Sequence, residues 1–184
     1  MSSTGCEREA SGMYDFISYD SPLGTLTVAA EGDALTALVI AGQKYAARHL
    51  AGEGRERETA VLREAKAWLD RYFAGERPDP AELPLAPKGT AFQRQVWREL
   101  LRIPCGRTES YGSLARRLGS SARAVGSAVG RNPISVIIPC HRVLGADGSL
   151  RGYAGGSENK KKLLTLEQIN TRTEKDDQKG PSPE

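Results

Sequence analysis

The sequence is poor in the residues that build metal sites and disulfide frameworks. Its 184 residues include only three cysteines and two histidines, and they do not stand at spacings typical of zinc ligands. The cysteines, Cys6, Cys105 and Cys140, are odd in number and widely separated, which argues against a disulfide framework and indicates a reducing compartment. We therefore expect a cytoplasmic protein that needs no metal and no cofactor.

Long apolar runs are missing as well. No stretch approaches the roughly 20 apolar residues that cross a bilayer. The N-terminal stretch has no apolar signal core, so we expect neither secretion nor membrane insertion. With 39% hydrophobic and 27% charged residues, the composition is typical of a soluble globular protein with one domain or two small ones.

The net charge of +3 conceals two halves of opposite sign. Residues 1–85 carry 9 basic and 14 acidic side chains, whereas residues 86–170 carry 14 basic and 5 acidic side chains. A basic half beside an acidic half is typical of a module that binds a polyanion. A solvated basic face would have the same composition, so the charge permits nucleic-acid binding without identifying it.

A proline-rich linker at residues 76–88 separates the two halves. The sequence predicts an α/β protein with an N-terminal antiparallel three-stranded sheet plus helix and a mostly α C-terminal domain. We expect strands near 14–19, 24–30 and 34–40 and a helix from Thr59 to Phe73. The predicted organisation is a disordered N-terminus at 1–12, an N-terminal domain at 13–85, a C-terminal domain at 86–170 and a disordered tail at 171–184.

The basic half contains the pattern of a helix-turn-helix. Ser110 can cap a first helix that ends at Gly119, and a second helix is expected at about 122–131. The outward face of the second helix is smooth and suits a minor groove better than base reading in a major groove. Two glycines inside a helix cost about 1 kcal/mol each, and tight helix packing remains an alternative reason for them. The predicted DNA-contacting residues are Arg123, Ala124, Gly126, Ser127, Gly130 and Arg131.

A short apolar run at 135–139 leads into Cys140 and His141. The run predicts a buried strand that ends at Pro139 and presents Cys140 where the chain leaves the core. His141 is a candidate base, and Arg142 is a candidate cation that would favour the thiolate. The alternative is a buried structural cysteine, which is the commoner fate of a free thiol.

Three other segments can serve this cysteine. An amphipathic helix at 157–169, with Leu163, Leu164, Leu166 and Ile169 on its face, can bring Glu167 back to orient His141. Asn132 can brace the turn before the apolar run. The glycine-rich loop at 152–156 carries Tyr153 and suits closing over a planar ligand.

Together these residues resemble the O6-alkylguanine-DNA alkyltransferases, also called methylated-DNA–protein-cysteine methyltransferases. The similarity runs from about Thr90 to Glu167, and the N-terminal strands and helix resemble the family's ribonuclease-H-like domain through weaker motifs. The motifs are FQRQVW at 92–97, SYGSLA at 110–115, ARAVG at 122–126, NPI at 132–134, IPCHRV at 138–143, GYAGG at 152–156 and the stretch 160–164.

The resemblance implies a single, irreversible transfer of the alkyl group of O6-alkylguanine to Cys140, with O4-alkylthymine as a second candidate substrate. The damaged base would be flipped out of the duplex before the thiolate attacks. By the same resemblance, His141 takes the thiol proton through a water and Glu167 orients His141. Tyr111 donates toward the departing guanine, and Asn132 holds the turn.

The resemblance also implies the partner, which is double-stranded DNA contacted in the minor groove by a monomer. Arg123 would fill the gap that the flipped nucleotide leaves, and cooperative binding stays open. The walls of the substrate pocket would be Val143, Tyr153, Ala154 and Gly155.

The sequence departs from the family at Cys105, where relatives often carry an aromatic residue, and it lacks the zinc-binding set of some relatives. A second hypothesis is a helix-turn-helix regulator or lesion sensor that makes no covalent bond. A cysteine hydrolase is disfavoured because no oxyanion loop is apparent.

Overall fold

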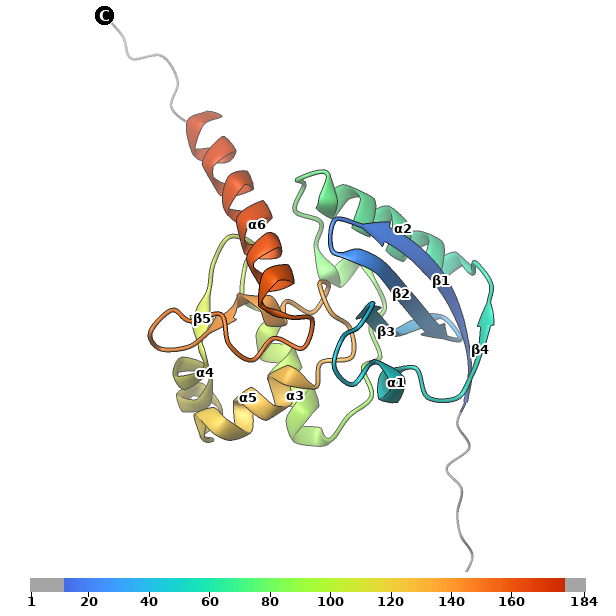
Figure 1. Ribbon diagram of the computed structural model, residues 1–184, viewed down its shortest axis with the longest axis horizontal. Helices are drawn as coiled ribbons and strands as arrows, with labels where there is room; N and C mark the ends of the chain where they lie inside the picture. Colours follow the sequence, from blue (N-terminus) through green and yellow to red (C-terminus); the bar gives the residue numbers. More distant parts are fainter. Residues whose placement is uncertain (1–11, 178–184) are drawn as a thin grey trace, which may run out of the picture.

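Two domains lie side by side in the computed structural model, which describes residues 12–177. The N-terminal domain is a sheet with α2 along one face, and the C-terminal domain is built mainly from short helices (Figure 1). One continuous hydrophobic core runs through both domains. The helices are α1 (Ala46–His49), α2 (Ala60–Phe73), α3 (Ala91–Leu100), α4 (Tyr111–Leu118), α5 (Ala122–Gly130) and α6 (Ser157–Asp177), with short 3₁₀ helices η1 (Pro80–Glu82) and η2 (Cys140–Arg142).

The N-terminal sheet has four strands in the order β3-β2-β1-β4 rather than the three that the sequence predicts. The strands β1 (Met13–Ser21), β2 (Gly24–Glu31) and β3 (Ala34–Ile40) form the expected antiparallel meander. The additional strand, β4 (Glu53–Glu56), pairs in parallel with β1. All four of its residues are exposed, so it has no apolar alternation that a sequence reading could detect.

The helix α2 forms where the spacing of apolar residues predicts it. Its inward side chains are buried against the sheet, and Gly75 follows its end with a left-handed φ of 97°. The linker then crosses to α3, where Thr90 and Gln93 form a capping box. In α3 the Trp97 indole donates a 2.8 Å hydrogen bond to the Ala128 carbonyl and so anchors α5.

The helices α4 and α5 form the predicted helix-turn-helix. Ser110 and Ser121 cap them, and their hydroxyls accept hydrogen bonds from the backbone amides of Ser113 and Ala124. Gly119 ends α4 in the left-handed region. The buried positions of α5 are Val125, Ala128 and Val129, which leaves the small-residue face outward.

The apolar run before Cys140 is not a strand, which corrects the prediction. Only Ile134 makes a bridge, to Leu38 of β3. The chain then turns at Val136, whose φ of 70° is unusual for a β-branched residue. Local bonds take up the backbone amides, from Ile137 to the Ser135 carbonyl and from Ile138 to the Ile134 carbonyl. The run is apolar because it lies in the core that both domains share. The next strand along the chain is the short β6 (Val143–Leu144), which pairs with β5 (Glu109–Ser110).

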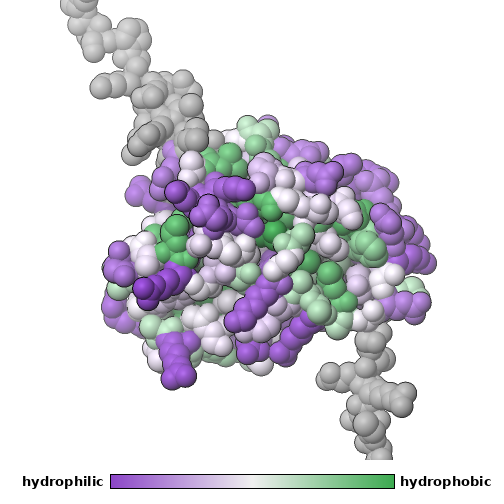
Figure 2. Space-filling model, in the orientation of Figure 1, coloured by the Kyte–Doolittle hydropathy of each residue, from purple (hydrophilic) through white to green (hydrophobic). Residues whose placement is uncertain are grey.

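The helix α6 is longer than predicted and extends to Asp177, into the stretch expected to be disordered. Leu163 and Leu164 are buried, whereas the side chain of Ile169 lies outside the described residues, as do residues 1–11 and 178–184. None of the helices within residues 12–177 is long and apolar enough to span a membrane. Figure 2 shows apolar side chains on the viewed face in separate small areas among hydrophilic ones.

Glycine substitutions in the helix-turn-helix test this geometry. We expect Gly119→Ala to lower the free energy of unfolding by about 1 kcal/mol, because alanine is strained at a φ of 61°. Gly126→Ala, inside α5, is the matched control. An added Cβ there would meet Tyr111 at an ordinary 3.7 Å, so we expect a gain of about 1 kcal/mol from helix propensity. Urea denaturation measures both, and equal losses would contradict the assigned backbone conformations.

Candidate active site

Cys140 begins η2 and is almost completely buried, with 4% of its surface exposed. Burial raises the pKa of the thiol to about 11, against a hydrogen bond from Asn132 and the positive charge of Lys160, which both lower it. At neutral pH only about one thiol in 10⁴ would then be ionised. Reaction at Cys140 therefore requires a base that removes the proton.

His141 and Glu167 are brought together as expected. The His141 Nε2 and the Glu167 Oε1 lie 2.6 Å apart, and both side chains are buried. Burial alone would raise the pKa of Glu167, but His141 and the hydrogen bonds from His141 and Arg142 outweigh it and hold the pKa well below its usual range. When Nε2 carries a proton, it donates to this carboxylate, and Nδ1 is then available as a proton acceptor.

Arg142 does not favour the thiolate, which corrects a second expectation. Its Nε and Nη2 donate to the two oxygens of Glu167 at 3.0 and 2.9 Å, and Nη1 donates to the Ile103 carbonyl at 2.6 Å. A fourth residue, Tyr72 of α2, donates its hydroxyl to Glu167 Oε1 at 2.7 Å. The guanidinium is therefore committed to the carboxylate, and the sequence reasoning did not include Tyr72.

Lys160 supplies the positive charge near Cys140 and was also missed as a site residue. It is fully buried, and its Nζ donates to the Val143 carbonyl at 2.5 Å. Burial lowers its pKa to about 8, and the proximity of Cys140 opposes that shift. A signal was present in the sequence, because Lys160 stands on the same helical face as Leu163, Leu164 and Glu167, at offsets of 3, 4 and 7.

Asn132 lies at the turn that carries the chain toward Cys140. Its Nδ2 donates to the carbonyls of Ile138 and Ile134 at 2.9 and 3.4 Å, and its Oδ1 accepts from the Ile134 amide at 3.0 Å. With its side chain buried, Asn132 satisfies backbone groups that no strand pairs. It thereby ties both ends of the apolar turn together.

The remaining residues expected at the pocket lie on α4, β6 and the glycine-rich loop. The Tyr111 hydroxyl donates to the Arg151 carbonyl at 3.1 Å, and burial raises its pKa to about 12. Val143 is fully buried beside the site. The glycine-rich loop packs on the N-terminal domain, because a Cβ at Gly155 would lie 2.8 Å from Ile40. A cavity of about 250 Å³ is lined by Lys44, Tyr45, Gly126, Ser127, Gly130, Gly152, Tyr153 and Ala154.

The outward face of α5 has the smooth surface that the sequence predicts. Arg123 and Ser127 are exposed, and Ala124 is half-buried. Packing within the chain does not require the two glycines, since a Cβ at Gly126 or Gly130 would meet its neighbours at 3.7 and 3.9 Å. This favours approach of an external molecule over helix packing as the reason for the glycines.

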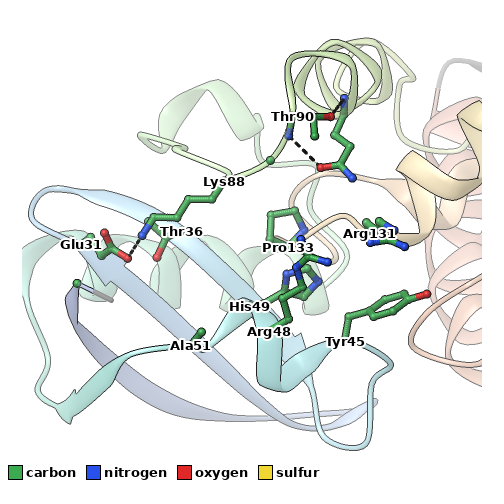
Figure 3. A pocket seen from close by; sticks show the side chains of 13 residues that line it. Glu31, Thr36, Tyr45, Arg48, His49, Ala51, Lys88, Thr90, Arg131 and Pro133 are labelled. Atoms are coloured by element: carbon green, nitrogen blue, oxygen red, sulfur yellow. Dashed lines mark hydrogen bonds and ion pairs between the residues drawn. The ribbon is translucent and has the colours of Figure 1, made fainter. Parts of the chain in front are cut away.

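Arg131 points away from that face. Its guanidinium lies 5.2 Å from the centre of the Tyr45 ring and lines a larger cavity of about 910 Å³ between the domains. Figure 3 shows Arg48 and His49 of α1 among the other side chains that line this cavity. Cys140 does not line it.

A buried cysteine with a histidine–carboxylate pair behind it, beside a helix-turn-helix and an α/β domain, defines a DNA-binding protein with a nucleophilic thiol. The family model described as 6-O-methylguanine DNA methyltransferase, DNA binding domain, matches residues 91–169. The model for the ribonuclease-like domain of the same methyltransferase matches residues 16–87. The chain belongs to this family of DNA-repair methyltransferases.

Individual relatives agree. The chain is 48% identical over 153 residues to a methylated-DNA–protein-cysteine methyltransferase of Mycobacterium leprae, with 82% of this chain and 90% of the relative covered. A constitutive enzyme of the same name from Bacillus subtilis is 42% identical, with 84% and 95% covered. A crystal structure of the Mycobacterium tuberculosis protein in complex with DNA has a TM-score of 0.73 and 42% identity, with 86% and 94% covered.

The buried charge of Glu167 predicts a pH-dependent stability. We expect Glu167→Gln to lower the free energy of unfolding by about 3 kcal/mol at pH 7, because Arg142 would stay buried without its charged partner. The folded-state pKa lies below the usual 4.5, so this contribution is present above pH 4.5 and is lost as the pH falls further. The difference in free energy of unfolding between wild type and Glu167→Gln should therefore become smaller below pH 4.5.

Glu58→Gln provides the control for this measurement. Glu58 is exposed and lies 3.7 Å from Arg63, a surface pair worth at most about 1 kcal/mol. Urea denaturation from pH 7 to 3 follows both variants. If Glu167→Gln loses the same free energy of unfolding at every pH, the assignment of Glu167 as an ionised carboxylate is contradicted.

Proposed function

We propose that this protein repairs DNA by taking the alkyl group of O6-alkylguanine onto Cys140, once per molecule. The observation that carries this proposal is the buried Cys140 followed directly in the chain by His141, whose ring contacts Glu167, in a domain with a helix-turn-helix that has a smooth outward face. A thiol with 4% exposure can be reached only by a group inserted into its pocket, which suits a base flipped out of a duplex.

The transfer is a displacement at carbon. The Cys140 sulfur forms a bond to the alkyl carbon while the bond from that carbon to O6 breaks, and the electron pair stays on the guanine. The proton that leaves Cys140 balances the proton that the departing guanine takes up. The product is a thioether, which the site has no means of reversing, so each molecule acts once.

His141 accepts the thiol proton through a bridging water in this mechanism. The support is that its Nδ1 is buried and has no hydrogen-bond partner among the described residues, while Nε2 is engaged by Glu167. Buried ring nitrogens are normally satisfied, and a water between His141 and Cys140 would do so. Lys160 assists by stabilising the negative charge on sulfur as it develops.

The other site residues act on the substrate. Tyr111 donates toward the departing guanine after its hydroxyl leaves the Arg151 carbonyl. Val143, Tyr153, Ala154 and Gly155 enclose the base, and Asn132 holds the turn that presents Cys140.

The outward face of α5 lies in the minor groove in this proposal. Its glycines let the helix approach the sugar–phosphate backbone, and Arg123 enters the stack at the vacated position. Ala124 and Ser127 would contact the DNA beside it, whereas Arg131 faces the Tyr45 ring and is left out of this contact. We further propose a cytoplasmic monomer with the domain boundary in the proline-rich linker.

A mass-spectrometric experiment tests the transfer. After incubation with a duplex that contains O6-methylguanine, we expect one methyl group on the peptide with Cys140 and one turnover per protein molecule. Cys140→Ala should bind the duplex without modification, whereas Cys105→Ala, which changes a half-buried thiol, should still become methylated. Wild-type protein that binds but stays unmodified would favour the lesion-sensing hypothesis instead.

Arg123 can be tested by comparing two substrates. We expect Arg123→Ala to slow the single-turnover reaction on the duplex by about tenfold or more, because the vacated position in the stack is no longer filled. Reaction with the free O6-alkylguanine base should be unaffected. Arg63→Ala, at an exposed position of α2, is the control and should change neither rate. Equal decreases in rate on the two substrates would show that Arg123 does not act in base flipping.

A further inference from the structure

The N-terminal domain contributes one side chain to the centre of the site. Tyr72 of α2 donates its hydroxyl to Glu167 Oε1 at 2.7 Å, across 95 positions of sequence. Tyr72 is 3% exposed and Glu167 is 1% exposed, so neither group can exchange this hydrogen bond for one to bulk solvent. The contact therefore joins α2 of the N-terminal domain to Glu167 of the C-terminal domain and, through Glu167, to His141.

The position of this hydroxyl is set by aromatic packing. The ring of Tyr72 stacks on Trp68 with centroids 5.5 Å apart and meets the edge of Phe73 at 5.2 Å. Trp68 is itself held by a 3.0 Å hydrogen bond from its indole to the Asp79 carbonyl. Burial, and then the charge of Glu167, raise the pKa of Tyr72 well above its usual value, so the hydroxyl remains a donor.

We propose that Tyr72 is a positioning residue for alkyl transfer. Its hydroxyl holds Glu167 against His141 and weakens the electrostatic effect of the Glu167 charge on the His141 ring. Oε1 of Glu167 accepts hydrogen bonds from three donors, His141, Arg142 and Tyr72, and each of them draws on the same negative charge. Without the Tyr72 hydroxyl, more of that charge acts on His141. The ring then keeps a proton to higher pH, so at a given acidic pH a smaller fraction of it is neutral and able to accept the proton of Cys140.

Several other groups act electrostatically on this cluster. Arg142 lies on the carboxylate, and Cys105 acts on both Tyr72 and Arg142. Cys140 and Lys160 act electrostatically on each other. A substitution that removes only the Tyr72 hydroxyl leaves all four in place.

The matched pair Tyr72→Phe and Tyr19→Phe tests the proposal. Tyr19 is also nearly buried, and its hydroxyl donates to Asp70 Oδ1 at 2.7 Å, away from the site. Each variant removes the hydroxyl of one tyrosine of the N-terminal domain and with it a 2.7 Å hydrogen bond to a carboxylate. Both are expected to lose stability to urea, so only a readout at His141 distinguishes positioning from structural support.

Two readouts report on His141. The chain has two histidines, and His49→Asn identifies the ring signals of His141 in nuclear magnetic resonance spectra. In Tyr72→Phe we expect the pH midpoint of those signals to rise by about half a pH unit or more, from the loss of one hydrogen bond to a charged group. The acid limb of the single-turnover rate on the methylated duplex should shift in the same direction. Tyr19→Phe should move neither.

The proposal is overturned if Tyr72→Phe leaves both the midpoint and the acid limb unchanged, or if Tyr19→Phe shifts them equally. The inference rests on the proposed function, and the two can fail separately. Wild-type protein that never becomes methylated would remove the function, while the resonance experiment still decides whether Tyr72 acts on His141. If wild-type protein becomes methylated but Tyr72→Phe leaves the His141 midpoint and the acid limb unchanged, only the role of Tyr72 is removed.

Discussion

The site depends on one buried negative charge, the carboxylate of Glu167. A buried carboxylate without partners would lose far more hydration energy than it gains, so its neighbours are determined by its need for donors. Arg142 binds both oxygens, and His141 and Tyr72 add a hydrogen bond each to Oε1. Since these donors come from η2 and α2, while Glu167 lies on α6, three elements must be in place before the charge is satisfied.

The same arrangement explains how Cys140 can stay protonated in the free protein and still lose its proton during the proposed reaction. Burial raises the pKa of Cys140 to about 11, which keeps the thiol protonated and unreactive toward molecules in solution. His141 is oriented by Glu167, and Lys160 offers a positive charge near the sulfur. In the proposed function, where each molecule acts once, this burial restricts the reaction to a substrate that enters the site.

The N-terminal domain takes part in building the site. The segment at 133–135 pairs with Leu38 of β3, through hydrogen bonds of 2.9 Å in both directions. The amide of Lys44 donates to the Ala154 carbonyl of the glycine-rich loop at 3.1 Å. Together with the Tyr72 contact, these bonds place the segment before Cys140, the pocket loop and Glu167 against one domain. The two domains therefore cannot move apart without disturbing the reacting groups.

Patterns within single elements were readable from the sequence. The periodicity of α2, the caps at Thr90, Ser110 and Ser121 and the left-handed Gly119 follow from local geometry and backbone hydrogen bonding. The order of the motifs around Cys140 indicated the family. The amphipathic pattern of residues 157–169 already suggested that Glu167 could reach His141, and the resemblance implied the same contact.

Tertiary structure decided whatever depends on partners distant in the chain. The exposed β4 has no apolar pattern, and the apolar run at 135–138 is buried by both domains without being a strand, because Asn132 and local turns satisfy its backbone. The partners of Arg142 and Tyr72 were undetermined for the same reason, since a side chain's type states what it can bind but not what the fold brings within reach. The sequence by itself determined where the longer helices form and indicated Cys140 as the candidate nucleophile. The fold alone decided that a tyrosine of one domain and a glutamate of the other would share a buried charge.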